Sequence, residues 1–339
     1  MSRRTWNKFT LINLNRLVGA NNPCPYQSSV DKPMITTKRA RWHHLLFFIG
    51  PAVLIYTLFM AWPLVDSLRL SLYARQEGEL VFVGLDNFDR LFNTPIFSER
   101  LWNAIKHNII WFAIFMAIQN PMGLLLASLI ASPRLRGAAI YRTIVFTPTT
   151  MSIVIIGWIW TLMLNPLWGI INDVFMFVGL EALIPSQGWL GSTTTALPVV
   201  ALVGVWQYIG MPFVLFLASL VGINQELIEA ARVDGATAWD VFWRIKFPLV
   251  LPTAGIVAIL TFVGNFSAFE NVYIMQGSQA GPDFSTDLLG TFFYRTTFGF
   301  LGTRPDLYMG TTIATVMFGI ILTGVLLYLF VIQRRLIRD

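Results

Sequence analysis

The chain has 339 residues, of which 55% are hydrophobic and only 12% are charged. The charged share is about half that of a typical soluble domain, which excludes an ordinary soluble fold and indicates a membrane protein. The formal net charge is +6, but nucleic-acid binding is not favoured, because it would need basic residues interleaved with aromatic ones on a folded surface.

The first 42 residues are basic and contain no apolar run like the central region of a signal peptide. We expect residues 1–42 to form a mobile cytoplasmic tail and the first apolar span to act as an uncleaved insertion signal. Cys24 in this tail is the only cysteine, which excludes a disulfide within the chain and any CxxC metal site.

Six apolar stretches are long enough to cross a membrane as helices, since a span needs roughly 20 apolar residues. The sequence therefore predicts an all-α, polytopic membrane fold, with residues 43–339 as one six-span domain. The predicted spans are Leu45–Asp66, Asn108–Ala131, Thr143–Leu164, Leu197–Val221, Leu251–Ile274 and Leu307–Ile332.

The positions of the basic residues predict the orientation, because short cytoplasmic loops retain Lys and Arg. Of the 24 such residues, eight lie in the tail, three in each of the loops after the second and fourth spans, and three after the last span. We therefore expect both termini to be cytoplasmic.

Catalytic and metal-binding patterns are missing from the sequence. It contains no GxxxxGK[ST], GxGxxG or GxSxG motif, so we expect no ATPase site of its own. The three histidines lack HExxH spacing, which favours interfacial roles over a metal site. The spans carry few carboxylates, chiefly Asp66 and Glu270. A proton-driven pump is therefore not favoured, because it would need intramembrane carboxylates to carry protons.

The loop of residues 222–248 has the features of a helical hairpin between two spans. Asn224 is a suitable N-cap for a first helix, and Gly235 interrupts it. A second helix, Ala236–Ile245, would carry an aromatic stripe, and Pro248 and Pro252 would set the turn into the fifth span. Residue chemistry leaves two interpretations open: a helix that docks in another protein's cleft, or one that lies on the inner leaflet.

The spacing in this loop resembles the EAA motif of ABC importer permeases. Glu229-Ala230-Ala231 is followed after three residues by Gly235, then after nine by Ile245, and then by Phe247-Pro248. The one departure is Phe247, where the family usually has Leu. Four other stretches resemble the carbohydrate branch of that family, and the resemblance covers roughly residues 45–335. They are LFFIGPAVLIYTLFMAWPLVDSLRLSLY, VGLDNF, WIWTLMLNPLWGIIN and QGSQAGPDFSTDLL.

The resemblance implies a type I importer permease, in the cell (inner) membrane of a bacterium, that forms half of a translocation pore. Its partners would be a second, non-identical permease, two cytoplasmic ATPase subunits and an external solute-binding protein. ATP and Mg²⁺ would bind in the ATPase subunits, and this chain would bind no cofactor or metal. The implied ATPase-coupling residues are Glu229, Ala230, Ala231, Asp234 and Gly235.

Comparison with the maltose-type permeases, anchored on Glu229, also implies substrate positions on the fourth and fifth spans. Each set has i, i+4, i+7 spacing, which lines one helical face, and Gln207 lies on the first of these faces. The open alternative is helix–helix packing through buried amides and small residues. The implied positions are Gly204, Gln207, Tyr208 and Met211 in one span and Thr261, Asn265 and Ala268 in the other.

Two further polar features lie in the spans, one in the fifth and one in the second. Glu270 would lie about 140° around an ideal helix from Asn265. It would then face the partner permease or external water. Gating of the pore and docking of the binding protein remain open as its role. Gln119 and Asn120, beside Pro121, are expected to mark a helix kink.

The predicted function is that of a binding-protein-dependent importer permease for a sugar, oligosaccharide, glycoside or polyol. The lack of cations along the implied face disfavours the alternative of a glycerol-phosphate-type substrate. A self-sufficient secondary carrier or channel would need an internal repeat and ion-coupling carboxylates. A membrane enzyme would need a paired acid–base or metal constellation.

Overall fold

The computed structural model describes residues 38–132, 135–300 and 304–333. The predicted tail before residue 38 lies outside the described residues. The chain divides after Ala61 into two parts, which are described separately. The first consists of α1 (Lys38–Tyr56) and a π-helical turn, η2 (Thr57–Ala61).

The second part is a helical bundle with one small sheet, so the all-α prediction is confirmed. The hairpin of β1 (Tyr73–Gln76) and β2 (Glu79–Phe82) was not predicted, although its Glu77-Gly78 turn takes the positive φ angles that such hairpins require. The elements before the middle of the bundle are α2 (Trp62–Leu70), α3 (Asp86–Asn93), α4 (Pro95–Ile114), η3 (Phe115–Gln119), α5 (Asn120–Ile130), α6 (Ala138–Thr150), α7 (Ile153–Met163), α8 (Ile170–Phe177) and η4 (Glu181–Leu183).

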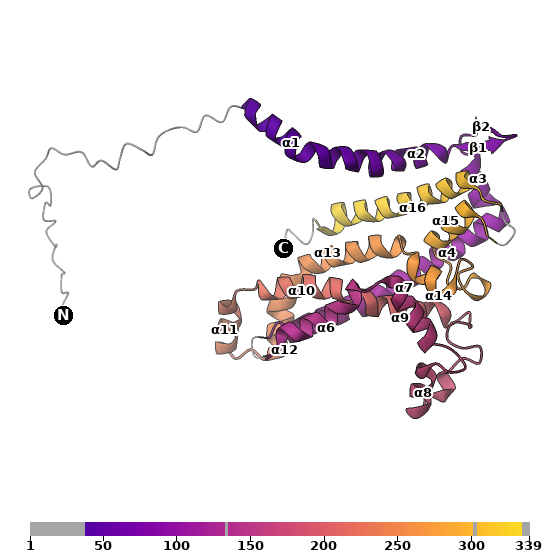
Figure 1. Ribbon diagram of the computed structural model, residues 1–339. Coiled ribbons are helices and arrows are strands. Elements are labelled where there is room, and N and C mark those ends of the chain that lie inside the picture. Colours follow the sequence, from indigo (N-terminus) through magenta and orange to yellow (C-terminus); the bar gives the residue numbers. More distant parts are fainter. Residues whose placement is uncertain (1–37, 133–134, 301–303, 334–339) are drawn as a thin grey trace, which may run out of the picture. The chain divides into compact units, whose positions relative to one another are not determined.

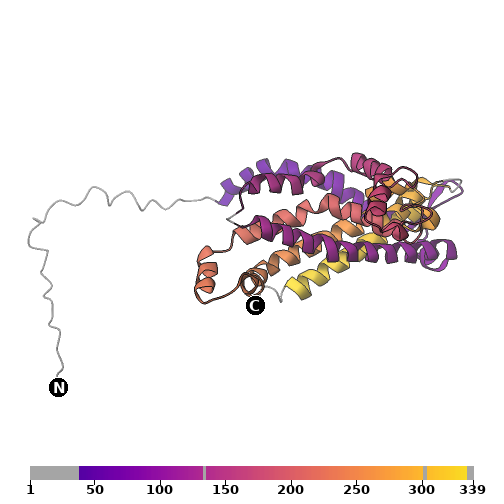
Figure 2. The ribbon, with the colours of Figure 1, turned by 90° about the horizontal axis from the view of Figure 1, so that it is seen from below.

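Later elements complete the bundle. They are α9 (Ala196–Tyr208), α10 (Gly210–Val221), α11 (Gln225–Val233), α12 (Ala238–Val241), η5 (Phe242–Lys246), α13 (Phe247–Phe266), α14 (Glu270–Gln276), η6 (Pro282–Phe284), α15 (Leu289–Phe298), α16 (Leu307–Leu327) and η7 (Tyr328–Gln333). Figures 1 and 2 show α11 and α12 at one end of this part, with β1, β2 and α3 at the opposite end.

The structure contains four helices that are long and apolar enough to cross a membrane among the described residues, and two bent helix pairs bring the total to six if each pair is one span. The straight spans are Leu46–Leu70, Pro95–Ile130, Ala238–Phe266 and Leu307–Val331. The predicted third and fourth spans correspond to the bent pairs. α6 and α7 meet at 93°, and α9 and α10 meet at 43°, next to Pro212. Pro212 lacks the N–H that would bond the carbonyl of Tyr208, which favours the second break.

The predicted fifth span, Leu251–Ile274, is wrong at both ends. At its start, Pro248 and Pro252 do not form a turn, because α12, η5 and α13 make one helix, Ala238–Phe266. The wider η5 turn precedes Pro248, so the helix absorbs the missing N–H instead of breaking there. At its end, the helix stops at Phe266, and α14 is a separate helix.

The second span shows the same response to proline. The expected kink near Gln119 and Asn120 takes the form of the η3 turn, in which the N–H of Asn120 bonds the carbonyl of Phe115 just before Pro121. The helix then continues as α5.

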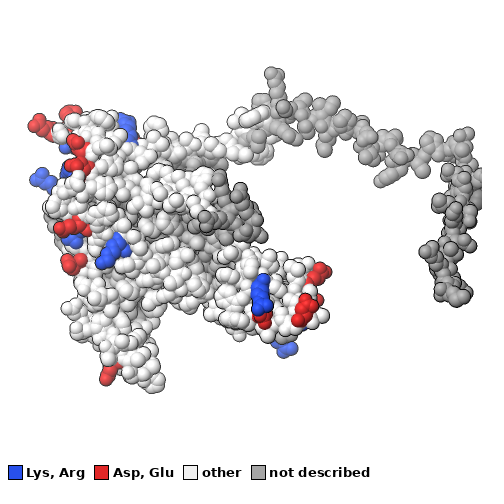
Figure 3. Space-filling view, turned by 180° about the vertical axis from the view of Figure 1, so that it is seen from behind, with Lys and Arg blue, Asp and Glu red and all other residues white. Residues whose placement is uncertain are grey.

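Three apolar cores hold the second part together. One joins α4, α7, α9 and α14, a second joins α5, α10, α11 and α13, and a third joins α4, α13, α15 and α16. Charged side chains lie mainly towards the two ends of the face shown in Figure 3, and the surface between is largely uncharged. This distribution is expected of a protein whose middle contacts lipid.

Candidate functional site

The helix α11 begins and ends as its sequence predicts. Asn224 accepts a hydrogen bond from the N–H of Glu226 at 3.0 Å, which is an N-cap. At the other end, Gly235 has φ +86°. The N–H of Gly235 donates to the carbonyl of Arg232, and the N–H of Ala236 donates to the carbonyl of Ala231. This pair of bonds is a Schellman motif, which closes the helix and turns the chain.

The predicted coupling residues lie together on this exposed hairpin. Glu229, Ala230, Asp234 and Gly235 are exposed, and Ala231 is half-buried against the second core. The helix also exposes apolar side chains, with Val233 87% and Leu227 52% accessible. Acidic, small and apolar groups together make a surface suited to another protein.

The chain re-enters the bundle through a second capped helix start. Thr237 and Asp240 form a reciprocal capping box before α12. The predicted separate helix Ala236–Ile245 is therefore only the first turns of the long fifth span. Its aromatic residues line an apolar cavity of about 550 Å³ with α5 and α10, and Trp243 packs edge-on against Trp239 at 5.5 Å between ring centroids.

A second cavity, of about 380 Å³, brings together most of the predicted substrate residues. Tyr208 and Met211 contribute to one wall, and Thr261, Asn265 and Ala268 to another. Sequence reasoning missed Trp111 and Phe115 on α4 and η3, which line it too. It assigned Gln119, a further lining residue, to a kink, although a buried amide is also a signal for a polar cavity.

Two predicted residues are not among those that line this cavity. Gly204 faces α4 and η3, and a β-carbon there would approach the Phe115 ring to 2.9 Å, which favours close helix packing at this position. Gln207 is only 1% exposed, and its side-chain oxygen accepts a hydrogen bond from Asn271 at 3.1 Å. For these two positions the structure favours the packing alternative.

Asn265 has the most distinctive environment in the cavity. Its Oδ1 accepts a hydrogen bond from Nε1 of Trp111 at 3.0 Å, which fixes the orientation of the amide because Trp can only donate. Its Nδ2 is buried and has no partner among the described residues. A buried donor without a partner costs about 1–3 kcal/mol, so this atom is well suited to bind a ligand oxygen.

A polar crosslink places Asn265. The side chain of Asn108 on α4 donates to the backbone carbonyl of Asn265 at 2.9 Å and accepts from the backbone N–H of Leu289 at 2.8 Å. One amide thus satisfies both the C-terminal end of α13 and the N-terminal start of α15.

Glu270 lies elsewhere than predicted. Because α13 ends at Phe266, Glu270 begins α14 and lines the same cavity as Asn265 instead of lying on another face of one helix. It is exposed, and it is the one acidic or basic side chain among the described residues that line the cavity.

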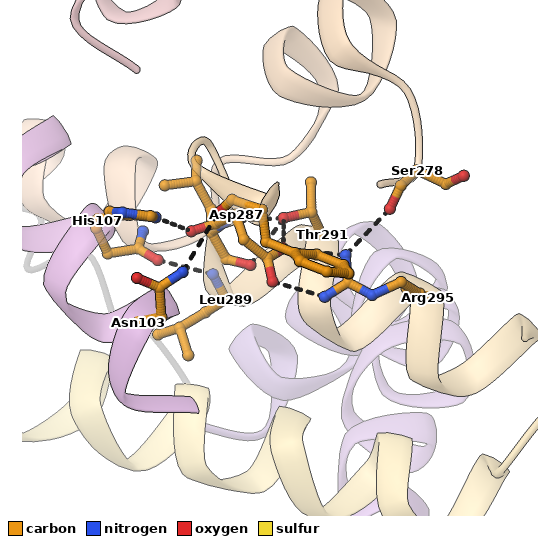
Figure 4. A network of polar contacts seen from close by, with 10 residues as sticks. Asn103, His107, Ser278, Asp287, Leu289, Thr291 and Arg295 are labelled. Atoms are coloured by element: carbon orange, nitrogen blue, oxygen red, sulfur yellow. Dashed lines mark hydrogen bonds and ion pairs between the residues drawn. The ribbon is translucent and has the colours of Figure 1, made fainter. Parts of the chain in front are cut away.

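The loop between α14 and α15 is fixed by the network in Figure 4. Arg295 pairs with Asp287, with 2.6 Å between Nη2 and Oδ2, and also donates to the carbonyl of Ser278. Thr291 donates to the same carboxylate, and Nδ1 of His107 lies 3.0 Å from the Asp287 carbonyl. This network ties the loop to α4.

The chain matches a known family of transport proteins. Residues 119–339 match the sequence model of the family described as binding-protein-dependent transport system inner membrane component. The chain belongs to this family, and it is therefore a multi-pass inner-membrane permease subunit of an ABC transporter. This finding argues against the alternative of a self-sufficient carrier.

Individual relatives agree with the family. The chain is 29% identical to the lactose transport system permease protein LacF of Rhizobium radiobacter, over 83% of this chain and 91% of that protein. It is 31% identical to the probable ABC transporter permease protein YurN of Bacillus subtilis, over 80% and 89% of the two. Among solved structures, a bacterial ABC transporter involved in the import of the acidic polysaccharide alginate matches with TM-score 0.72 and 25% identity, covering 88% of this chain and 96% of that one.

Proposed function

We propose that this chain forms half of the translocation pore of an importer for a neutral sugar, oligosaccharide, glycoside or polyol. The single observation that supports this best is the buried Nδ2 of Asn265, which has no partner among the described residues and lies at the 380 Å³ cavity that Trp111, Tyr208 and Thr261 also line. Aromatic faces with a few fixed hydrogen-bonding groups are what a polyhydroxylated ring requires.

The charge of the cavity favours a neutral solute over an anionic one. Glu270 is the one charged side chain among its described lining residues, and phosphate or carboxylate groups normally need Arg or Lys. A glycerol-phosphate-type substrate is therefore less favoured. Lactose, named for one relative, is a neutral sugar, whereas the alginate of the matched structure is acidic.

The energy for transport would come from ATP bound by partner subunits. The exposed surface of α11 would dock on one of two cytoplasmic ATPase subunits, which bind ATP and Mg²⁺, while this chain binds no cofactor. A second, non-identical permease would complete the pore, and an external binding protein would deliver the solute. This assignment places both termini in the cytoplasm and the cavity towards the outer side. ATP closure then shifts the pore through contacts that differ between its two states.

The cavity is tested by Asn265→Asp in the complete transporter. Aspartate keeps the acceptor for Trp111 but removes the free donor and adds a negative charge beside Glu270. We expect the half-saturating concentration for uptake of a panel of neutral sugars, lactose included, to rise at least about tenfold. Leu202→Asn, on an exposed face of α9 away from the cavity, is the control for amide chemistry in a span. Unchanged affinity of Asn265→Asp would assign this residue to packing.

The coupling surface is tested by Glu229→Lys. The side chain is exposed, so the reversed charge leaves the fold intact while it opposes docking. We expect normal membrane insertion with loss of solute-stimulated ATP hydrolysis in the reconstituted complex. Glu181→Lys, an exposed acid in η4 at the far end of the bundle, is the control. Full stimulation in Glu229→Lys would contradict the coupling role.

A further inference from the structure

Four aromatic side chains form a continuous row beside the cavity. Phe269 and Tyr273 come from the start and middle of α14, and Tyr294 and Phe298 from α15. The ring centroids are 5.0 Å apart between Phe269 and Tyr273, 4.9 Å between Phe269 and Tyr294, and 4.9 Å between Tyr294 and Phe298. Tyr273 and Tyr294 also touch, at 5.0 Å.

The backbone explains why this row exists. Gly290, Tyr294 and Phe298 share one face of α15 at i, i+4 spacing. A β-carbon at Gly290 would lie 2.6 Å from the carbonyl oxygen of Ala268 and 3.0 Å from Cβ of Phe269. Glycine therefore lets α15 approach the break after α13 closely enough for Tyr294 to reach Phe269.

The row differs from the aromatic clusters of the cores. Phe266, for example, is buried among α4, α13 and α15, and packs at 4.6 Å from Phe262. In contrast, Phe298 is 62% exposed, and Phe269, Tyr273 and Tyr294 are each half-buried. Their rings are thus accessible to a ligand.

The row is continuous with the cavity and carries polar groups. Phe269 is both its first ring and a lining residue of the cavity, next to Glu270. The pKa of the Tyr294 phenol is raised, chiefly by hydrogen bonding to Tyr273, whose ring centroid lies 5.0 Å away. The guanidinium of nearby Arg295 is already bound by Asp287 and the Ser278 carbonyl, and so does not offer a free cation to an anionic ligand.

We propose that Phe269, Tyr273, Tyr294 and Phe298 form an external sugar-binding track, on which pyranose rings of a neutral oligosaccharide stack before the leading ring enters the cavity. The inference rests on the proposed function and adds a second binding surface to it. The C–H-rich face of a pyranose packs on an aromatic ring, and its hydroxyls bond the phenols and the Glu270 carboxylate. A lipid tail would gain nothing from these hydroxyls, and α14 and α15, which carry the row, lie towards the side of the bundle that holds β1 and β2 (Figure 1).

The test is direct binding to the full-length chain in lipid nanodiscs, followed by saturation-transfer NMR with glucose, lactose and raffinose. Phe298→Ala and Tyr294→Ala should weaken binding of the trisaccharide about fivefold, the effect of one lost ring contact, and leave glucose affinity unchanged. Tyr294→Phe keeps the ring and should lose less. Phe177→Ala, which removes an aromatic side chain that is 93% exposed on α8, is the matched control.

The outcomes separate the two proposals. Asn265→Asp should weaken all three sugars, because it alters the cavity. If it does so while Phe298→Ala and Tyr294→Ala bind raffinose like the wild type, the track is overturned and the cavity stands. If the wild-type chain binds none of the sugars, both are overturned. If Phe298→Ala binds sugars normally but no longer co-purifies with the second permease, the row is a subunit contact and not a track. Phe298 is the last residue of α15 and is 62% exposed, so its truncation removes one ring contact, with Tyr294, and should leave the fold intact.

Discussion

The two ends of the bundle are built by different means. At the α11 end, the structure is held by local hydrogen bonds, such as the Asn224 cap, the Gly235 turn and the Thr237–Asp240 box, each between residues at most five apart. At the cavity end, the decisive bonds join residues 157 and 181 apart in sequence through Asn108. The limits of the hairpin are therefore set by neighbouring residues, although Ile228 packs it into the second core, whereas the cavity depends on helices that meet only after folding.

The substitution Asn108→Leu gives the strongest test of the difference between the two ends. It leaves the N–H of Leu289 buried without its partner, at a cost of about 1–3 kcal/mol, and removes the side-chain bond to the carbonyl of Asn265, which keeps its bond from the N–H of Ala268. We expect a large fall in the thermal unfolding temperature of the purified chain. Asn103→Leu on the same helix removes one half-buried bond, to the carbonyl of Phe284, and should cost less. Equal melting of the two variants would mean that Asn108 does not hold the cavity end.

A smaller effect is expected from close packing on α16. A β-carbon at Gly310 would collide with the side chain of Thr297 on α15, whereas one at Gly319 would meet no described atom within 4 Å. Gly310→Ala should therefore destabilise the chain by about 1–3 kcal/mol. Gly319→Ala should be neutral or slightly stabilising, because alanine favours helix. The check is the midpoint of unfolding for each variant, and a loss at Gly319 as large as at Gly310 would contradict the packing argument.

The same contrast explains what the sequence could predict. The spans follow from apolar length, and the limits of α11 follow from Asn224 and Gly235, because those signals are local. The candidate substrate positions were found by aligning the chain with the family at the EAA motif. The cavity does bring three of them, Tyr208, Thr261 and Asn265, together.

The failures arise where distant segments decide the structure. The helix end at Phe266 carries no proline or glycine in the next two residues, Ser267 and Ala268. It is fixed instead by Asn108 on α4, and by α15 packing against Ala268. An ideal-helix projection of Glu270 was therefore bound to fail. At Pro248 the error was the reverse, because a turn was predicted where the helix continues. The π-helical turn before Pro248 allows the membrane helix to continue past the proline.

A small and local effect on folding is expected from substitutions at Gly235, at the α11 end of the bundle. Here the measurement that matters is coupling to ATP hydrolysis. A β-carbon there meets nothing within 4 Å, so the only obstacle to another residue is the φ of +86°. Gly235→Val should cost about 1–2 kcal/mol, confined to the end of α11, since β-branched residues strongly disfavour left-handed backbone. Gly235→Asn, which tolerates that backbone, should behave almost as the wild type. If the hairpin is a docking element, the valine variant keeps its unfolding temperature within a few degrees yet loses solute-stimulated ATP hydrolysis in the complex, and the asparagine variant retains it. Equal activity of both variants would show that the geometry of this turn does not transmit coupling.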